Sequence, residues 1–552
     1  MILQIKGLTK QRFTSIQASV EQTNKVFVML CHAGVSRCFR FPGWPCLRAI
    51  RRFQHPNERK EHGEVTEVTA PEEFESWRRG IKSWDQGGWL HLNAAGASPC
   101  SQEVFDAMTQ FLSKERDVGG YEAEAQYVKH GRDARQAAAE LLGCDADEIA
   151  LTESAQSAWA KAFACLAFRP GDHIFCWASE YAGNAVAFVQ AAKKGVKLQV
   201  LPMRSDGVVD IESLEKALES MPSSSRSLVA LTHIQTNSSI VQPAAAVGKI
   251  AQKHGAIFLL DTCQSIGQLP VNLRALGCDF ACGTGRKWLR GPRGTGLLYA
   301  RKSVLPQSES SESQTGLRYE GPSSSSLVGE PAMIDHVSAS WKRSDHYELS
   351  AGARRFEMWE SSPALHCGLA VAIDACRTIG PERIFRRASF LAELLRDELR
   401  QNQGVTLRDA PETSTAAATS AARCAIVTFE ASGLGITADE IKEALTQRRI
   451  AVSVAPPFHT FDDSAWNLPA TVRLSPSYYN TEEEIHAAAE TVRDILKSKK
   501  VRAALMLDMD ITCDSHSSLL PSIPSQLFQM SFICLRKSHS LSAMAAACPR
   551  LL

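Results

Sequence analysis

The sequence predicts an α/β protein with a mostly parallel sheet that helices cover on both faces. Two observations lead to this fold class. Short apolar, β-rich segments alternate with segments of helical periodicity from about residue 84 to 300, and a second, smaller set of strands and helices follows from about 365 to 499. The 552-residue chain is 44% hydrophobic and 22% charged, which is typical of an ordinary globular protein with at least two domains.

The elements follow from local pattern, in chain order. In the larger part, short β-rich segments predict strands, and apolar positions at helical spacing predict the helices between them. In the smaller part, Thr481 and Glu484 have the spacing of a capping box and predict the start of a final helix. The expected strands lie within 148–152, 172–179, 197–203, 227–234, 256–264, 294–301, 424–430, 450–456 and 470–475, and three of the expected helices within 182–195, 211–221 and 244–255.

Five parts are expected along the chain. Residues 1–70 form a basic extension with the charge bias of an organelle transit segment, because Glu21 is the only acid before Glu58; a disordered leader is the alternative. Residues 71–98 are expected to pack on the small domain, 99–345 to form the large domain with a Ser-rich insertion near 307–326, and 346–499 to form the small domain. Residues 500–552 lose periodicity and are expected to be a poorly ordered tail.

Composition argues against several classes of function. A formal net charge of +1 provides no global field for nucleic acid, and no apolar run approaches the roughly 18 residues that span a bilayer. Sixteen cysteines in a chain this long, mostly within apolar runs, indicate reduced thiols in a protein that is not secreted. Cys278 and Cys282 lack zinc-finger spacing, so strand packing is favoured over a metal site. We expect a cytoplasmic or organellar protein with no metal.

Lys287 lies in a Gly-rich loop, "GTGRKWLRGPRGTG", which could be a phosphate cradle, a polyanion site, a turn or the anchor of a covalently bound cofactor. A Walker-type loop needs Lys directly after the second Gly and Ser or Thr after the Lys, whereas Arg286 and Trp288 flank Lys287. A dinucleotide loop would follow the first strand, and this loop comes late. These two nucleotide-binding interpretations therefore fail.

The cofactor-anchor interpretation needs an acid and a phosphate site as well as the lysine. Asp261 ends an apolar strand and Gln264 follows it, at the carboxyl edge where open α/β sheets bind ligands. A capping or turn role for Asp261 is the alternative. Ser154, Ala155 and Gln156 lie where a strand turns into a helix, so their N–H groups suit a phosphate, or form an ordinary N-cap.

These residues carry a resemblance to a known family. The segment from "DTCQSIGQ" to "GTGLLYARK" resembles the cofactor-binding core of the class V aminotransferases, fold-type I pyridoxal phosphate (PLP) enzymes that include cysteine desulfurases. The similarity extends from "HLNAAGASP" at residue 91 to "RLSPSYYNTEEEI" at residue 473. It implies a large domain with a mostly parallel, seven-stranded-type sheet, a smaller C-terminal αβ domain, PLP as cofactor and a homodimer that acts on a small amino-acid substrate.

The resemblance also implies a role for each matching residue. Lys287 binds the cofactor as an imine, Asp261 pairs with its pyridinium nitrogen, and Gln264 hydrogen-bonds its ring hydroxyl. Tyr181 stacks on the ring, and Arg473 holds the substrate carboxylate. The remaining positions are Asn237 or Thr236 at the ring edge, Ser154, Ala155, Gln156, Thr284 and Arg286 at the phosphate, Ser361 or Ser362 from the second subunit, and Asn93 and Tyr121 at the substrate.

The sequence leaves the reaction open among elimination, transamination and epimerisation. A persulfide-forming desulfurase needs a mobile nucleophilic cysteine ahead of Arg473, yet no cysteine lies between Cys424 and Cys513. The segments "VGGYEAEA", "GRKWLRGPRGTG", "LTQRRIAVSV" and "RLSPSYYNT" resemble the hercynylcysteine sulfoxide lyases of ergothioneine synthesis, which favours a carbon–sulfur lyase. Tyr121, Trp159 or Trp359 would then face a quaternary ammonium group. A cofactor-free scaffold protein is the alternative of another class.

Overall fold

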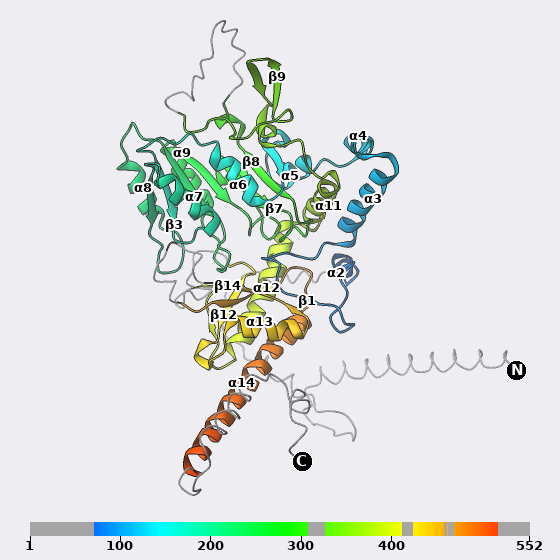
Figure 1. The fold of residues 1–552 in the computed structure, drawn as a ribbon, viewed down its shortest axis with the longest axis vertical. Helices are drawn as coiled ribbons and strands as arrows, with labels where there is room; N and C mark the ends of the chain where they lie inside the picture. Colours follow the sequence, from blue (N-terminus) through cyan, green and yellow to red (C-terminus); the bar gives the residue numbers. More distant parts are fainter. Residues whose placement is uncertain (1–70, 307–325, 411–422, 457–460, 462–467, 517–552) are drawn as a thin grey trace, which may run out of the picture. The chain divides into compact units, whose positions relative to one another are not determined.

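The computed structural model describes residues 71–306, 326–410, 423–456, 461 and 468–516. The basic extension and almost all of the Ser-rich insertion lie outside the described residues. Thr69–Leu552 forms one compact unit, in which a large and a small domain follow each other along the chain (Figure 1).

The large domain is built on a seven-stranded sheet in the order β2-β8-β7-β6-β5-β3-β4. Neighbouring strands from β7 to β4 are parallel, whereas β8 is antiparallel to both β7 and β2. The fold class is thus the α/β class with a mostly parallel sheet that the sequence predicts. The strands are β2 (Ile149–Thr152), β3 (His173–Trp177), β4 (Lys197–Leu201), β5 (Ser227–Thr232), β6 (Ile257–Asp261), β7 (Phe280–Thr284) and β8 (Gly296–Ala300).

Both faces of this sheet are buried, and alternating residues show it. In β5, Val229 and Leu231 belong to one core cluster while Leu228 and Ala230 belong to another. A parallel strand that is buried on both faces reads as a continuous apolar run, which explains segments such as "SLVAL". The helices of this domain are α3 (Gln102–Val118), α4 (Gly120–His130), α5 (Ala134–Leu142), α6 (Ala155–Ala164), α7 (Ala182–Ala192), α8 (Ile211–Glu219), α9 (Ala244–Lys253), α10 (Leu273–Leu276) and α11 (Pro363–Ile379).

The small domain contains a four-stranded antiparallel sheet in the order β11-β12-β15-β14. A two-residue strand from the N-terminal segment, β1 (Leu90–His91), pairs with β13 (Ile450–Ala451) of this domain. The other elements are α12 (Pro381–Arg400), β11 (Thr406–Leu407), β12 (Val427–Glu430), α13 (Ala438–Gln447), β14 (Ser453–Ala455), β15 (Thr471–Leu474) and α14 (Glu482–His516), with α2 (Pro71–Arg78) at the N-terminal side.

Several details differ from the sequence-based expectations. The expected strands omit β7, because its small residues and glycine weaken the β pattern. A hairpin of β9 (Ala339–Arg343) and β10 (His346–Leu349) crosses the expected boundary at 345. The next helix, α11, packs on α3 and α5 of the large domain.

The expected capping box at the start of the last helix is present. The Glu484 N–H donates to the Thr481 hydroxyl, and the Thr481 N–H donates to the Glu484 carboxylate. Its helix, α14, ends at His516, so the expected tail from 500 begins as helix.

Short 3-10 helices complete the described chain. They are η1 (Ala146–Glu148), η2 (Lys302–Val304), η3 (Gly352–Phe356) and η4 (Ser432–Leu434).

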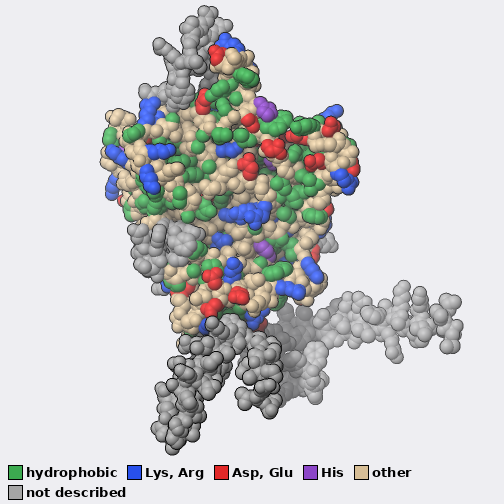
Figure 2. Space-filling view, viewed as in Figure 1, with side chains coloured by type: hydrophobic (Ala, Val, Ile, Leu, Met, Phe, Trp, Pro, Cys, Tyr) green, Lys and Arg blue, Asp and Glu red, His purple; other side chains and the backbone are tan. Residues whose placement is uncertain are grey.

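No helix among the described residues is long and apolar enough to cross a bilayer. Figure 2 shows acidic and basic side chains spread over the face in view, with a small group of basic side chains near its middle.

Candidate active site

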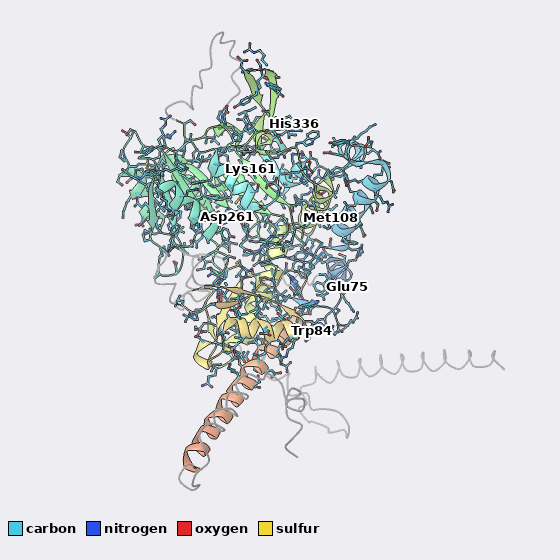
Figure 3. The ribbon with its side chains drawn as sticks, viewed as in Figure 1. Glu75, Trp84, Met108, Lys161, Asp261 and His336 are labelled. Carbon is cyan, nitrogen blue, oxygen red and sulfur yellow. The ribbon has the colours of Figure 1, made fainter. Side chains whose placement is uncertain are left out.

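The expected site residues gather at one edge of the large sheet, where β2, β5, β6 and β7 end and β8 begins. Asp261 is the last residue of β6, and its strand neighbours in register are Thr232 of β5 and Cys282 of β7. Thr284 at the end of β7 and Thr152 at the end of β2 both pair with Gly296. Figure 3 places Asp261 at the edge of the sheet that faces the small domain, which is where open parallel sheets bind ligands.

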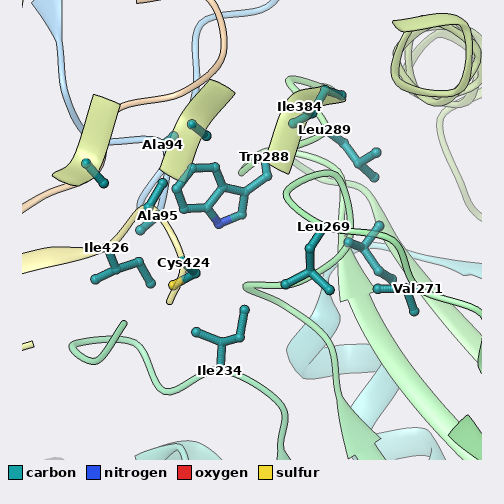
Figure 4. Packing of buried hydrophobic residues seen from close by; sticks show 14 of the residues in the cluster. Ala94, Ala95, Ile234, Leu269, Val271, Trp288, Leu289, Ile384, Cys424 and Ile426 are labelled. Carbon is teal, nitrogen blue, oxygen red and sulfur yellow. The ribbon is translucent and has the colours of Figure 1, made fainter. Parts of the chain in front are cut away.

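Lys287 follows β7 in a loop that buried neighbours hold firmly. Trp288, next to Lys287, packs in the core beside Ala94 and Ala95 (Figure 4) and donates its indole N–H to Gln264 at 2.9 Å. Arg290 is buried with a positive φ of 59°, and its guanidinium donates to the backbone oxygens of the N-terminal segment. The loop is therefore fixed directly after Lys287.

Burial lowers the pKa of Lys287 from its ordinary value, and the nearby cations Arg286 and Arg473 add to this effect. Asp261 and Cys263 act in the opposite direction. Because desolvation is the largest cause, a larger fraction of the amine is neutral near pH 7 than for an exposed lysine. A neutral amine is the form that attacks a carbonyl carbon or accepts a proton.

Arg473, on β15 of the small domain, reaches the large domain. Its Nη1 donates to the hydroxyl and the backbone oxygen of Thr236 at 2.7 and 2.9 Å. The side chain is 8% exposed, and its Nε finds no partner among the described residues. Burial lowers the pKa of Arg473 to about 10, with a further contribution from Arg286. A buried guanidinium with an open donor is suited to a carboxylate ligand.

Asp261 is held by two donors and linked to a second buried acid. Its carboxylate accepts from the backbone N–H of Cys263 at 2.9 Å and from the amide of Asn184 at 3.3 Å. The same Asn184 amide donates to Glu180 at 2.8 Å. Neither Glu180 nor Asn184 is among the expected site residues, because a Glu-x-x-x-Asn spacing alone reads as an exposed helix face.

The expected phosphate loop lies directly against the start of β8. Ser154 is the N-cap of α6 and accepts from Ser157 N–H, so Ala155 and Gln156 open the helix. A Cβ at Gly296 would lie 2.3 Å from the carbonyl carbon of Ser154, so only glycine permits this close approach. The N-terminus of α6 and the end of β7 therefore meet at one place, a geometry suited to a phosphate.

The structure places five more expected residues at the same edge or in the segments around it. Tyr181 is the N-cap of α7 and is 44% exposed, and Gln156 and Tyr181 both lie close to Gly183. Gln264 already donates to Ala95 and Thr236, so a bond to a ring hydroxyl would replace one of these contacts. Arg286 donates to the backbone oxygen of Gly96, and the backbone oxygen of Asn237 accepts from Thr428. The buried Oδ1 of Asn93 has no partner among the described residues.

Two expected site residues lie elsewhere in this chain. Ser361 is exposed and lines a separate cavity with Arg135 and His366. Tyr121 is 72% exposed on α4, and its ring lies 6.3 Å from that of Trp359, which contacts His336. Figure 3 shows His336 well separated from Asp261. Tyr121 is therefore away from Asp261 in a single chain, whereas Ser361 faces the cavity with Arg135 and His366.

The cysteines add one feature that spacing did not reveal. Cys424, Cys278 and Cys282 are buried in the core, as strand packing requires. Cys282, however, also lies beside Cys263 and Asp261, with their sulfur and oxygen atoms within 4.8 Å of one another. A hydrogen bond to Cys263 and burial raise the pKa of the Cys282 thiol. The signal is visible only in three dimensions, because strand pairing joins residues far apart in the sequence.

Comparison with known proteins places the chain in a family. The model of the class V aminotransferases matches residues 90–487. The chain belongs to the class V aminotransferase family. This assignment makes it a PLP-dependent enzyme of fold type I.

Curated relatives and solved structures agree with this class V assignment. A probable cysteine desulfurase from Methanothermobacter thermautotrophicus is 28% identical over 415 residues, covering 74% of this chain and 94% of the relative. Cysteine desulfurase from Thermococcus onnurineus superposes with a TM-score of 0.62 at 23% identity, covering 74% of this chain and 95% of that one. The cystine C–S lyase C-DES, solved with its product cysteine persulfide, gives 0.59 at 22% identity, covering 73% and 97%.

The residues of this class V protein fit PLP. Arg286 and Arg473 are cations that act on Lys287, and this positive charge suits a phosphate and a carboxylate together. Arg473 Nε and Asn93 Oδ1 are buried without a partner among the described residues. Lys287 would hold the cofactor covalently, Asp261 its ring nitrogen, and the start of α6 its phosphate.

Proposed function

We propose that this class V protein cleaves the carbon–sulfur bond of an amino acid by β-elimination, without a cysteine nucleophile. The observation that carries the proposal is the absence of cysteine between Cys424 and Cys513, the stretch that contains the loop ahead of Arg473. Cys424 itself is fully buried, and its thiol faces the backbone oxygen of Ser238. A sulfur-accepting nucleophile must reach the substrate as a thiolate, and burial raises the pKa of Cys424 to about 12.

The chain's own residues supply the steps of such a reaction. Arg473 binds the α-carboxylate and orients the substrate. The Lys287 amine would remove the α-proton, for which its lowered pKa is suited. When bound, PLP would supply the electron sink for this chemistry, and Asp261 would keep its ring nitrogen protonated. The electrons of the broken Cα–H bond would form a Cα–Cβ double bond as the Cβ–S bond breaks, and the sulfur group would leave with the pair of that bond.

Two other reactions need the same residues. Transamination and epimerisation also begin with removal of the α-proton, so Lys287, Asp261 and Arg473 do not separate them from elimination. The relatives named as cysteine desulfurases, and the structural neighbour named as a cystine C–S lyase, act on sulfur amino acids by those names. These names support a sulfur amino acid as the substrate, and the choice among the three reactions is left to the product assay below.

A hercynylcysteine sulfoxide is the specific substrate that we propose from the four resembling segments. Its trimethylammonium group needs an aromatic wall. Trp159 is buried and stacks on Phe163 at 4.8 Å, so it is a core residue. Tyr121 and Trp359 lie together on the surface and are the remaining candidates.

These two residues would serve the site only if a second chain brings them there, and we propose a homodimer. Exposed apolar side chains continue from Trp359 and Tyr121 along α3 and α4, which a partner subunit would cover. Ser361, two residues beyond Trp359, would then supply its hydroxyl to the partner's phosphate site. The exposed apolar residues of α3 and α4 are Phe105, Leu112, Val118, Tyr121 and Val128.

The cofactor is tested first. The purified protein and a Lys287→Ala variant are each incubated with PLP, reduced with borohydride and digested. A pyridoxyl label on the Lys287 peptide of the wild type, absent from the variant, is expected. A wild type that takes up no PLP at any concentration would support the cofactor-free scaffold and contradict the enzyme.

The reaction is tested by its products. The loaded protein is given L-cysteine, cystine, S-alkyl cysteine sulfoxides and hercynylcysteine sulfoxide. Pyruvate and ammonia formed in equal amounts indicate β-elimination, whereas alanine indicates desulfuration. Amine transfer that depends on a keto acid, or loss of optical activity without pyruvate, would assign the aminotransferase or the epimerase instead.

A further inference from the structure

A second buried carboxyl lies behind Asp261, and the proposed reaction does not use it. Glu180 is 3% exposed, between the end of β3 and the start of α7. One of its oxygens, Oε1, accepts from the hydroxyl of Thr232, the amide of Asn184 and the backbone N–H of Tyr181. An acid with three donors on one oxygen is held in a fixed orientation.

Asn184 connects this acid to Asp261. An asparagine amide has two N–H donors, and Nδ2 of Asn184 directs them to Glu180 Oε1 at 2.8 Å and to Asp261 Oδ2 at 3.3 Å. Asn184 is 1% exposed and Thr232 is 5% exposed, so water does not replace these contacts. The two carboxyls therefore share one buried donor.

The charge on Glu180 is sensitive to pH near neutrality. Burial raises the pKa of Glu180 to about 7, against the three hydrogen bonds that favour its anion. The titratable groups that face it are Asp261 of β6, Cys176 of β3 and Cys282 of β7, all of them acids. At pH 6 most of the Glu180 carboxyl is therefore neutral, and at pH 8 a second negative charge lies behind Asp261.

We infer that Glu180 is a positioning residue of the cofactor site, which orients Asp261 through Asn184 and, when ionised, strengthens the hold of Asp261 on a protonated pyridine nitrogen. The inference rests on the proposed assignment of Asp261 to that nitrogen. An ionised Glu180 next to Asp261 adds negative charge to this side of the site. A pyridine nitrogen bound to Asp261 would then hold its proton more strongly, because nearby negative charge favours the cation.

The test compares the PLP affinity of the wild type and Glu180→Gln from pH 6 to pH 8. Gln keeps the size and the acceptor oxygen but cannot ionise. The ratio of the two affinities is expected to change about tenfold in favour of the wild type across this range, the effect of one pKa unit of interaction, with a midpoint near pH 7. Thr232→Val removes one hydrogen-bond donor to the Glu180 anion. In this background the pH at the midpoint of the change in PLP affinity therefore moves to a higher value.

The control is Glu430→Gln, in the small domain. Glu430 is also buried, but hydrogen bonds to Ser432 and Arg408 outweigh its burial and lower its pKa, so it does not titrate in this range. The ratio of the PLP affinity of Glu430→Gln to that of the wild type is therefore expected to stay constant from pH 6 to pH 8. If the Glu180→Gln ratio is flat as well while both proteins bind PLP, the inference is wrong.

A second readout separates the two proposals. The pyridoxyl label on Lys287 tests the cofactor assignment without reference to Glu180. Urea unfolding of the PLP-free protein between pH 5 and pH 8 tests whether Glu180 titrates. A label on Lys287 with no difference in pH dependence between wild type and Glu180→Gln contradicts the inference alone. Absence of any label contradicts the proposed function, and the inference falls with it.

Discussion

At the scale of single residues, Glu180 gives the folded protein a pH dependence that an exposed glutamate would not. Its pKa is about 7 in the fold and 4.5 ordinarily. Between these two pH values the folded protein binds one more proton than the unfolded chain. The contribution of Glu180 to the free energy of unfolding is therefore complete below pH 4.5 and is lost as pH rises through 7. Relative to wild type, PLP-free Glu180→Gln should gain ~3 kcal/mol in unfolding free energy from pH 4 to pH 8. Urea titrations at each pH measure it, and parallel curves would show that Glu180 does not titrate in this range.

At the scale of elements, the contact between the start of β8 and the loop before α6 is set by one glycine. Because a Cβ at Gly296 would lie 2.3 Å from the Ser154 carbonyl carbon, Gly296→Ala must displace the expected phosphate loop. Overpacking of this kind costs about 1–3 kcal/mol, so a loop displaced by this amount of energy should lower PLP affinity about fivefold to 150-fold. The matched control is Gly433→Ala, where a Cβ meets nothing within 4 Å. Equal affinities of the two variants, measured by fluorescence titration, would contradict a phosphate site at this loop.

A buried ion pair joins α12 to the segment before β12. Arg396 and Asp409 are both 0% exposed and lie 2.9 Å apart, and Asp409 also pairs with Arg423. Asp409→Ala leaves these guanidinium groups without this carboxylate, so the unfolding free energy should fall by about 3–5 kcal/mol. Asp397→Ala removes an exposed pair with Arg400 on the same helix and should change it by less than about 1 kcal/mol. Urea unfolding compares the two, and similar losses would mean that burial does not determine the strength of the pair.

Local pattern predicted the strands of the large sheet except β7, whereas helices such as α3, α5 and α12 were not named from the sequence. Apolar runs predicted the strands that are buried on both faces, since burial and β-propensity act together there. β7 was missed because "FACGT" is built from small residues, and the end of α14 was misplaced because sequence periodicity fades before the helix does. The edge at which Lys287 and Asp261 meet followed from topology, since parallel strands end on the same side.

At the scale of the whole molecule, sequence motifs single out candidate cofactor residues, whereas the residues that support them carry no motif. Lys287, Asp261 and Arg473 carry recognisable patterns in the chain. Glu180, Asn184 and Cys263 do not, because their significance comes from contacts across strands that no spacing encodes. Conversely, Tyr121 has pattern support but lies on the surface beside Trp359, so its expected role depends on a second subunit.

The proposed homodimer gives the last prediction. The outer faces of α3 and α4 expose Leu112 and Val128, at 53% and 77%. In Figure 1 these helices lie on the side of the fold opposite β3, the strand that pairs with β4. Leu112→Glu/Val128→Glu would place two charges in a contact that excludes water, so the variant should sediment as a monomer. Its PLP affinity should also fall, because Ser361 of the partner subunit no longer reaches the phosphate. Val200→Glu, exposed at the β4 edge, is the control and should remain dimeric. A wild type that sediments as a monomer with full PLP affinity would show that one chain completes the site, and Ser361 and Tyr121 would then have no part in it.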